Sequence, residues 1–331
     1  MGEERYKKYI VVFLDILGFQ DKIREAGNDP SKILSMADLL DAVKEKVIEL
    51  HQGIPDNPHL KVRIFSDTIV LSCLDEGEAF LSMVPVISLF QASMAQQGHF
   101  LRGGIVAGDH LEKNYTIFGP AIIQAYKLEK LAIWPRVVIH ASVWSDFKPK
   151  VAEWVKGMTL LPSPDGLTYL NYLQHAFIWT VEEEWKSEYR GGKISFPWPT
   201  SLDMFDAHKN AILNRAKASN VRANIDVLTK YHSLAEYHNM VAEIMCKYLS
   251  FPIKGSDPIL PTPAHALHII GAVWAEEFQS KAFKDDSEEK RKKFWESKMA
   301  ALSKKCDLFL TSRIDLIDTF PDLYLRPNRQ P

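Results

Sequence analysis

Two aspartates in the first quarter of the chain have the residue type and surroundings to do chemistry. Asp15 interrupts the apolar run at residues 9–19, and Asp67 interrupts a second apolar stretch at residues 61–72. A carboxylate in such surroundings is costly unless a cation or hydrogen bonds compensate it. Two carboxylates brought together by adjacent strands make an oxygen site for Mg²⁺ or Mn²⁺. We therefore expect Asp15 and Asp67 to share a metal site.

The elements that must position these aspartates follow from hydrophobic spacing. Residues 9–16 predict a buried strand that breaks at Gly18, and residues 61–72 predict a hairpin with Ser66 and Asp67 near its bend. Apolar residues recur at helical spacing over residues 33–50 and 78–97, which predicts two helices. The hairpin therefore lies between two helices in the chain.

The rest of the first half continues the alternation. A strand over residues 100–108 contains small residues that let another backbone approach closely, a helix follows to Leu131, and residues 136–140 form another strand. The predicted order is strand, helix, hairpin, helix, strand, helix, strand. This order favours an α+β fold with helices on one face of the sheet.

The second half has a different character. Residues 151–200 are mixed, with a strand expected over 167–173, and the composition then turns helical. Helices are expected over residues 208–219, 220–248, 265–278 and 288–302. We expect a core at residues 1–150 and a structural, mainly helical extension at 151–331 that packs on it.

Composition and charge narrow the function classes. The 331 residues have a formal net charge of −2 with the two signs interspersed, which argues against nucleic-acid polymer or an anionic membrane surface as the partner. Three cysteines far apart in the chain favour a reducing compartment. The absence of a long apolar run or signal peptide favours a cytoplasmic protein.

Four short segments together resemble the class III nucleotidyl cyclases. They match in order and spacing over about residues 8–145, and they are Phe13-Leu14-Asp15-Ile16-Leu17-Gly18-Phe19, Phe65-Ser66-Asp67, Leu101-Arg102-Gly103-Gly104-Ile105 and Phe118-Gly119-Pro120-Ala121 through Leu128-Glu129. The resemblance implies a ferredoxin-like, palm-like sheet.

Two further segments resemble the pyrimidine cyclases of the bacterial anti-phage system called Pycsar. They are residues 119–136, with Ala125-Tyr126-Lys127-Leu128-Glu129 and Trp134-Pro135-Arg136, and residues 230–239. This branch implies that infection activates the enzyme and that a separate effector protein reads the product.

The class resemblance assigns roles to the residues near the two aspartates. Asp15, the main-chain carbonyl of Ile16, and Asp67 would hold two metal ions, Mn²⁺ or Mg²⁺. Such a pair helps a ribose 3′-hydroxyl attack the α-phosphorus and neutralises the departing diphosphate. The backbone amides of Leu17, Gly18 and Phe19 would cradle phosphate, and Arg102 would bind the triphosphate.

Base choice in the class depends on two positions that here are Arg63 and Thr116. The adenine-reading members carry Lys and Asp there, which speaks against an adenylate or guanylate cyclase. Arg63 offers only donors and so suits a carbonyl-edged base such as uracil, whereas Thr116 can donate or accept. We expect UTP as the substrate, with CTP as the alternative.

The helix after Gly119 departs from the class. The transition-state asparagine and arginine of the family align here with Ile123 and Lys127, and isoleucine cannot hydrogen-bond a ribose. Lys127 keeps the charge without the guanidinium fork. In the family these groups come from the opposite protomer, so the resemblance implies a homodimer. The departure leaves open a binding module that has lost turnover.

Overall fold

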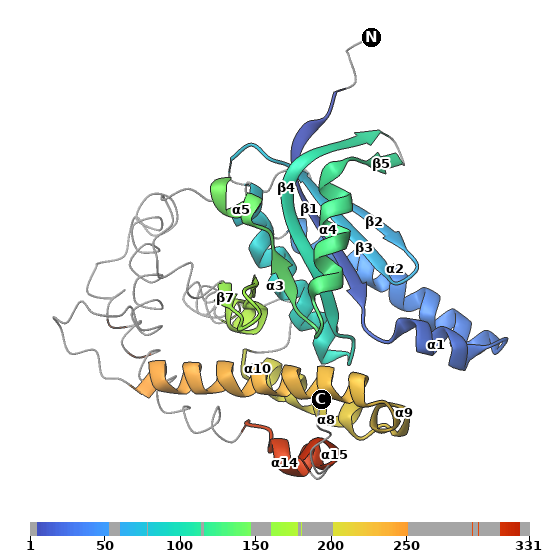
Figure 1. Ribbon diagram of the computed structural model, residues 1–331, viewed down its shortest axis with the longest axis vertical. Helices are drawn as coiled ribbons and strands as arrows, with labels where there is room; N and C mark the ends of the chain where they lie inside the picture. Colours follow the sequence, from blue (N-terminus) through green and yellow to red (C-terminus); the bar gives the residue numbers. More distant parts are fainter. Residues whose placement is uncertain are drawn as a thin grey trace. The chain divides into compact units, whose positions relative to one another are not determined.

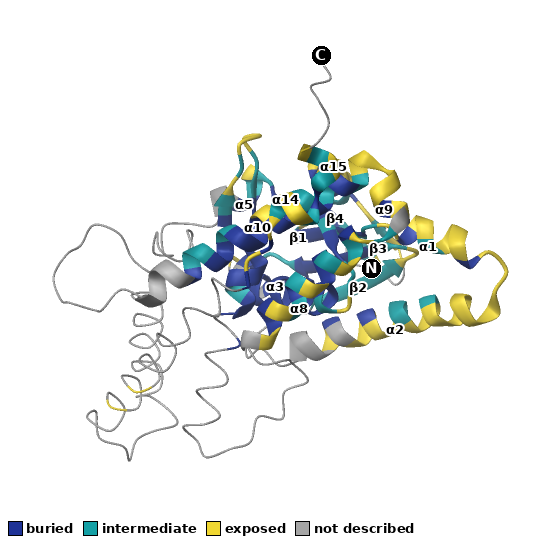
Figure 2. Cartoon of the chain, turned by 90° about the horizontal axis from the view of Figure 1, so that it is seen from below, coloured by how far each residue is buried: buried dark blue, intermediate teal, exposed yellow. Residues whose placement is uncertain are grey.

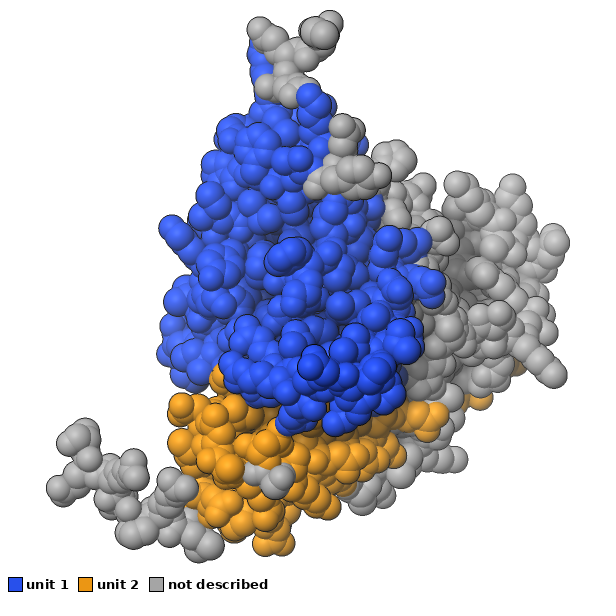
Figure 3. All heavy atoms as spheres, turned by 90° about the vertical axis from the view of Figure 1, so that its right-hand side faces the viewer, with its two compact units in different colours: residues 1–152, 159–172 blue, residues 153–158, 173–331 orange. Residues whose placement is uncertain are grey.

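The computed structural model describes residues 5–52, 60–77, 79–113, 116–146, 160–177, 180, 201–250, 293, 297 and 312–324. The helix expected over 265–278 lies outside these residues, as does the helix over 288–302 apart from two positions. The chain divides into two compact units, Met1–Ala152 with Thr159–Tyr172 and Glu153–Met158 with Leu173–Pro331 (Figure 3). No helix in the described part of the chain has the length and apolar character needed to cross a membrane.

The first unit is built on one mixed sheet. Its strands are β1 (Lys7–Ile16), β2 (Lys61–Phe65), β3 (Thr68–Leu74), β4 (Leu101–Lys113), β5 (Thr116–Phe118), β6 (Val137–Ile139), β7 (Leu160–Pro162) and β8 (Thr168–Leu170). Their order is β2-β3-β1-β4-β6-β8-β7, with β5 paired to β4. Only β4 and β6 run parallel among the pairs described. The sheet therefore includes strands beyond residue 150, the boundary predicted from the sequence.

Helices cover both faces of this sheet. The helices of the first unit are α1 (Phe19–Ala26), α2 (Pro30–Gln52), α3 (Ala79–Gln96), α4 (Pro120–Leu131) and α5 (Ala141–Asp146). Helix α4 packs against Val11, Val70 and Val106 on one face, and Figure 1 shows α2 and α3 on the other side of the sheet. The expectation of helices on one face is therefore wrong. The apolar run of β1 has no polar alternation because both of its faces are buried.

The two helices on the far side differ in burial. Helix α3 is apolar almost throughout, and its described side chains are nearly all buried. Helix α2 is largely exposed and buries Val43 and Val47 (Figure 2). An amphipathic helix with a narrow apolar stripe is typical of the outer layer of a domain, so α3 carries more of the core than α2 does.

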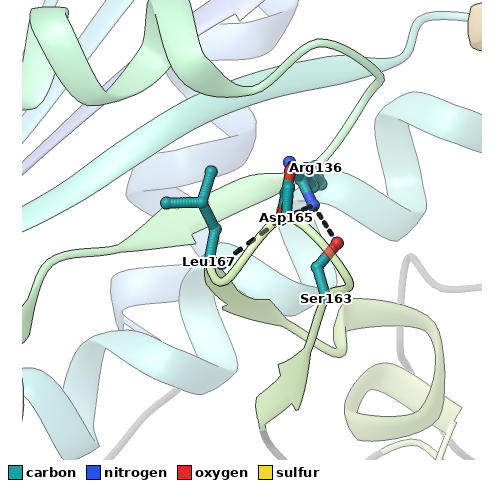
Figure 4. A network of polar contacts seen from close by, with 4 residues as sticks. All are labelled: Arg136, Ser163, Asp165 and Leu167. Atoms are coloured by element: carbon teal, nitrogen blue, oxygen red, sulfur yellow. Dashed lines mark hydrogen bonds and ion pairs between the residues drawn. The ribbon is translucent and has the colours of Figure 1, made fainter.

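A buried arginine fixes the strands that follow α4. The Arg136 guanidinium is ion-paired with Asp165 and donates to the Ser163 hydroxyl at 2.7 Å (Figure 4). Its charge also lies over the rings of Trp134 and Tyr169, at 5.2 and 5.6 Å from their centroids. These contacts hold the loop before β8 against the residue that precedes β6.

The second unit is helical where it is described. Its helices are α8 (Ser201–Ala216), α9 (Ser219–Ala223), α10 (Ile225–Ser250), α14 (Leu316–Thr319) and α15 (Pro321–Tyr324). The buried imidazoles of His208 and His238 stack between α8 and α10, with their Nδ1 atoms 3.1 Å apart. The side-chain amide of Asn239 on α10 donates to the Ile314 carbonyl through Nδ2 and accepts from the Ile314 N–H through Oδ1. The helical character expected after residue 201 is present over the described residues 201–250.

Candidate active site

The C-terminal end of β1, a central strand, brings the two candidate metal ligands to one end of the sheet. Asp15 pairs with Thr68 on one side and with Arg102 on the other. The Ile16 N–H donates to the Asp67 carbonyl at 3.1 Å, which ties the bend of the β2–β3 hairpin to the end of β1. The strand pairing therefore places Asp15, Ile16 and Asp67 together, as the sequence spacing suggested.

The hairpin bend that carries Asp67 is conformationally strained. Phe65 pairs with Thr68, so Ser66 and Asp67 form a two-residue turn. Ser66 has φ of 56°, the only positive value among the described residues other than glycine. A serine in this region is held there by its surroundings. The tight turn fixes where Asp67 lies relative to Asp15.

Arg102 connects two carboxylates. Its Nε atom donates to Oδ2 of Asp15 at 2.8 Å and lies 2.8 Å from Oε1 of Glu129. Glu129 comes from α4 and its side chain is 1% exposed, with Lys130 Nζ 3.3 Å from its other oxygen. The arginine assigned to the triphosphate therefore already has two anionic partners on its own chain.

Glu129 is a residue of this site to which the sequence analysis gave no role. It follows Leu128 on the side of α4 that packs on the sheet, together with Ala121, Ala125 and Ala132. A carboxylate in an apolar helical stripe requires a counter-ion across the interface. That requirement signals a cation on the sheet, but the sequence does not indicate which one.

The site carries more negative than positive charge. Burial is the main cause that raises the pKa of Asp15, and the charges of Glu129 and Asp67 raise it further, whereas the bond and charge of Arg102 lower it. The three carboxylates of Asp15, Asp67 and Glu129 thus outnumber the two cations of the site, Arg102 and Lys130. Such a site attracts a cation, because each added positive charge stabilises the ionised form of Asp15.

The side chains present fit a divalent cation of the Mg²⁺ or Mn²⁺ type. The described residues contain no group of three or more His, Cys, Asp and Glu side chains arranged around a metal position. Mg²⁺ is usually held by one or two carboxylates together with water and substrate phosphates, so Asp15 and Asp67 suffice. Their surplus negative charge is the observation that supports the fit.

The turn after β1 offers part of the expected phosphate cradle. Gly18 has φ of 75° and is the N-cap of α1 with no side-chain cap, so a non-glycine residue would be strained there. The Leu17 N–H, however, donates to the Phe100 carbonyl at 2.9 Å. Leu17 is therefore removed from the set of phosphate donors, and Gly18 and Phe19 remain the candidates.

The two candidate base-reading residues lie in different surroundings. Arg63 on β2 is opposite Val70, which faces α4, so Arg63 shares the face of Asp15. Thr116 is exposed and pairs with Lys113, whereas Ile117 packs inward next to it. Neighbouring strand residues point to opposite faces, so Thr116 points outward from the hairpin.

The outer side of α4 carries the residues that depart from the cyclase pattern. Ile123 is 57% exposed, and both Tyr126 and Lys127 are exposed as well. The buried side of the same helix faces β1 and β4. Lys127 therefore lies on the outer side of α4, opposite the side that carries Glu129.

Comparisons with known proteins add little to this geometry. No protein-family model matches the chain, and no curated protein matches it. Among solved structures, a class III adenylyl cyclase-like ATP-binding protein from Pseudomonas aeruginosa is similar, with 13% identity and a TM-score of 0.34. The match covers 51% of this chain and 40% of that one, which is too distant to carry an assignment.

Proposed function

We propose that this chain is a metal-dependent pyrimidine nucleotide cyclase that converts UTP to 3′,5′-cyclic UMP and diphosphate. The observation that carries the proposal is the meeting of Asp15 and Asp67 beside Arg102 at one end of the sheet. CTP is the alternative substrate. The cyclase motifs of the sequence supply the reaction type.

The chain's own residues would divide the work as follows. Asp15, Asp67 and the Ile16 carbonyl would hold the divalent cations. When bound, these ions would neutralise the triphosphate and acidify the 3′-hydroxyl. The amides of Gly18 and Phe19 would accept a phosphate at the start of α1.

Arg102 would exchange one anionic partner for another. Its Nε bond to Asp15 competes with cation binding by the same carboxylate. Glu129 lies 2.8 Å from the same Nε atom, so the guanidinium would stay at the site when Asp15 turns to a cation. Its remaining donors would then bind the phosphates of the substrate in a fork geometry.

The proposed assembly is a homodimer in which Lys127 acts on the site of the partner copy. Its support is the outer side of α4, where three large apolar residues are exposed near Lys127, namely Ile123, Tyr126 and Leu131. An exposed apolar group of this kind is typical of a surface that another protein covers. A Lys127 supplied in trans would place a cation near the leaving diphosphate.

The biological setting that we propose is a cytoplasmic anti-phage response. The cyclic nucleotide would act as a second messenger for a separate effector protein. The support for this setting is the resemblance of residues 119–136 and 230–239 to Pycsar cyclases. Detection of the cyclic nucleotide in infected cells that express the chain, and its absence with Asp67→Ala, tests it.

A second candidate is a nucleotide-binding module without turnover. Ile123 favours it, because the side chain in the position of the family asparagine cannot hydrogen-bond. The engagement of Arg102 by Asp15 and Glu129 also favours it. Binding of a nucleoside triphosphate without product would identify this candidate.

The deciding experiment incubates the full chain with each of the four labelled ribonucleoside triphosphates and Mn²⁺ or Mg²⁺. We expect cyclic UMP, and no product from Asp67→Ala. Asp21→Ala is the matched control, because Asp21 is exposed on α1 and forms an ion pair with Arg24 one turn further along the same helix. A cyclic purine product would refute the base assignment, and the absence of any product would refute turnover.

A further inference from the structure

A second polar cluster lies on the same face of the sheet as Asp15. It is centred on Ser72 of β3, four residues after Thr68, the residue that pairs with Asp15. Lys61 on β2 and Ser72 on β3 are directly opposite each other. Ser72 pairs with Val11, whose side chain packs under α4, and Asp15 lies on the same side of β1 as Val11. The two polar side chains thus share the face of the candidate active site.

Glu112 completes this cluster from the far end of β4. Its Oε1 accepts from the Ser72 hydroxyl at 2.5 Å, and its Oε2 lies 2.7 Å from Lys61 Nζ. These contacts are possible because β4 curves strongly along its length (Figure 1). We call β4 from Asp109 onward, together with β5, the β4–β5 arm. Glu112 therefore connects this arm to β2 and β3.

The Glu112 carboxylate is buried and charged. Its side chain is 1% exposed. Burial alone would raise the pKa of Glu112, but the contacts with His110, Lys61 and Ser72 outweigh it and lower the pKa to about 2. His110 is itself fully buried, with Nε2 3.9 Å from Oε1 and its ring edge against Tyr9. A buried charge with three partners fixes geometry more strictly than an apolar contact would.

The cluster lies beside the strand that presents Arg63. Arg63 is two residues from Lys61 on β2 and shares its face, so the Lys61–Glu112 ion pair sets how far the arm lies from Arg63. Thr116, the other base-reading candidate, belongs to the same arm. One ion pair thus links the two elements that carry the candidate base-reading residues.

We propose that Glu112 is a positioning residue that sets the width of the nucleobase pocket by tying the β4–β5 arm to β2. This inference rests on the proposed function, and it names the determinant of base preference within that site. Glu112 does not touch the base; it acts through the placement of Arg63 and of the arm. Loss of the tie widens the pocket and weakens discrimination between pyrimidine and purine.

The test compares Glu112→Gln with Asp109→Asn, which removes an exposed carboxylate from the same strand. Calorimetry measures the affinities of the full chain for UTP, CTP, ATP and GTP with Mg²⁺. We expect Glu112→Gln to reduce the pyrimidine-to-purine affinity ratio by about tenfold, the scale of one charge-assisted contact. Asp109→Asn should leave the ratio unchanged.

Two further variants separate positioning from folding. Ser72→Ala removes one contact of Glu112 and should lower the ratio in the same direction by a smaller factor. The exchange Lys61→Glu with Glu112→Lys restores the ion pair and should recover the ratio. A ratio that is unchanged in Glu112→Gln and Ser72→Ala, while both variants unfold at lower temperature, overturns the inference.

Turnover is measured in parallel, so that the two proposals fail separately. If the wild-type chain binds triphosphates and makes no cyclic product, the cyclase proposal fails and the affinity ratio still decides the role of Glu112. If the wild-type chain binds none of the four triphosphates, both proposals fail.

Discussion

Arg136 and Arg102, a buried and a partly buried arginine of the first unit, differ in how their charge is balanced. Arg136 is 1% exposed and faces one carboxylate and a hydroxyl (Figure 4). It also lies against the rings of Trp134 and Tyr169. Arg102 is shared between Asp15 and Glu129, with Asp67 close by. The first network is balanced in charge, whereas the second has a surplus of negative charge.

The comparison separates a structural arginine from a functional one. The network of Arg136 is balanced in charge and would not be stabilised by a further ion. Its contacts therefore serve to hold β6 and β8 together. The surplus negative charge around Arg102 does not stabilise the fold, because a buried excess of one sign is costly. It becomes favourable when a cation and a triphosphate are present.

The largest expected effect tests this distinction through turnover. Arg102→Met should lower the rate of cyclic nucleotide formation by at least about 100-fold, the loss typical for one preorganised charge-stabilising donor. Arg136→Met should lower the rate only in proportion to the fraction of unfolded chain. Steady-state rates per folded molecule check this, and equal losses in the two variants would contradict the distinction.

Stability gives the second test, and here we expect the larger loss at Arg136. Arg136→Met should reduce the free energy of unfolding by about 2–3 kcal/mol, because it removes the buried guanidinium contacts with Ser163 and Asp165, although the Leu167 N–H still donates to Asp165. Chemical denaturation measures the loss. Lys8→Met, a change at an exposed position of β1, is the control and should stay within about 0.5 kcal/mol.

Removal of the Asp15 charge should change stability by a smaller amount than Arg136→Met, and in the opposite direction. Its pKa is raised in the folded chain, mainly by burial, so its contribution to stability is present at low pH and is lost as pH rises through that pKa. Asp15→Asn should therefore raise the melting temperature at pH 7 while it abolishes turnover. The gain should shrink as pH falls below the raised pKa, and a lower melting temperature at pH 7 would contradict this account.

The smallest expected change in stability is that of Asp165→Asn. The bond from Arg136 is the main cause that lowers its pKa, so its stabilising contribution is present at neutral pH and is lost as pH falls through the lowered pKa. Asp165→Asn should cost about 1 kcal/mol or less at pH 7, because the carboxylate is 38% exposed and screened by solvent. In unfolding curves the difference between variant and wild type should begin to shrink at about pH 4 and should disappear below the lowered pKa.

The parts of the site that follow from local spacing could be predicted from the sequence. Asp15 interrupts an apolar strand, and Asp67 lies in a two-residue bend, so strand pairing alone brings them together. The hairpin and the helices α2, α3 and α4 follow from apolar periodicity in the same way. A strand was expected over residues 167–173, where β8 lies, but its pairing with β6 and with β7 was not predicted. Each of β7 and β8 has only three residues and therefore carries little periodicity.

The parts that depend on long-range contacts could not be predicted. Glu129 meets Arg102 across a helix–sheet interface, and Glu112 reaches Ser72 only because β4 curves. The Leu17 amide is used by Phe100, a pairing that no local pattern indicates. The cover of both sheet faces likewise depends on tertiary packing and not on the order of elements.

Two adjacent glycines on β4 have a consequence for how this sequence can vary. A Cβ atom on Gly103 would lie 2.3 Å from the Phe13 carbonyl, and one on Gly104 would lie 2.6 Å from the Ala125 carbonyl. The first contact is with β1 and the second with α4, so neither position admits a side chain without moving main chain. In a population of variants, both sites should be closed to all other residues whether or not the protein is needed for catalysis. Arg102, their neighbour, is limited by charge and not by space, because the buried Glu129 carboxylate needs a cation there. Three consecutive codons would therefore record two different physical constraints.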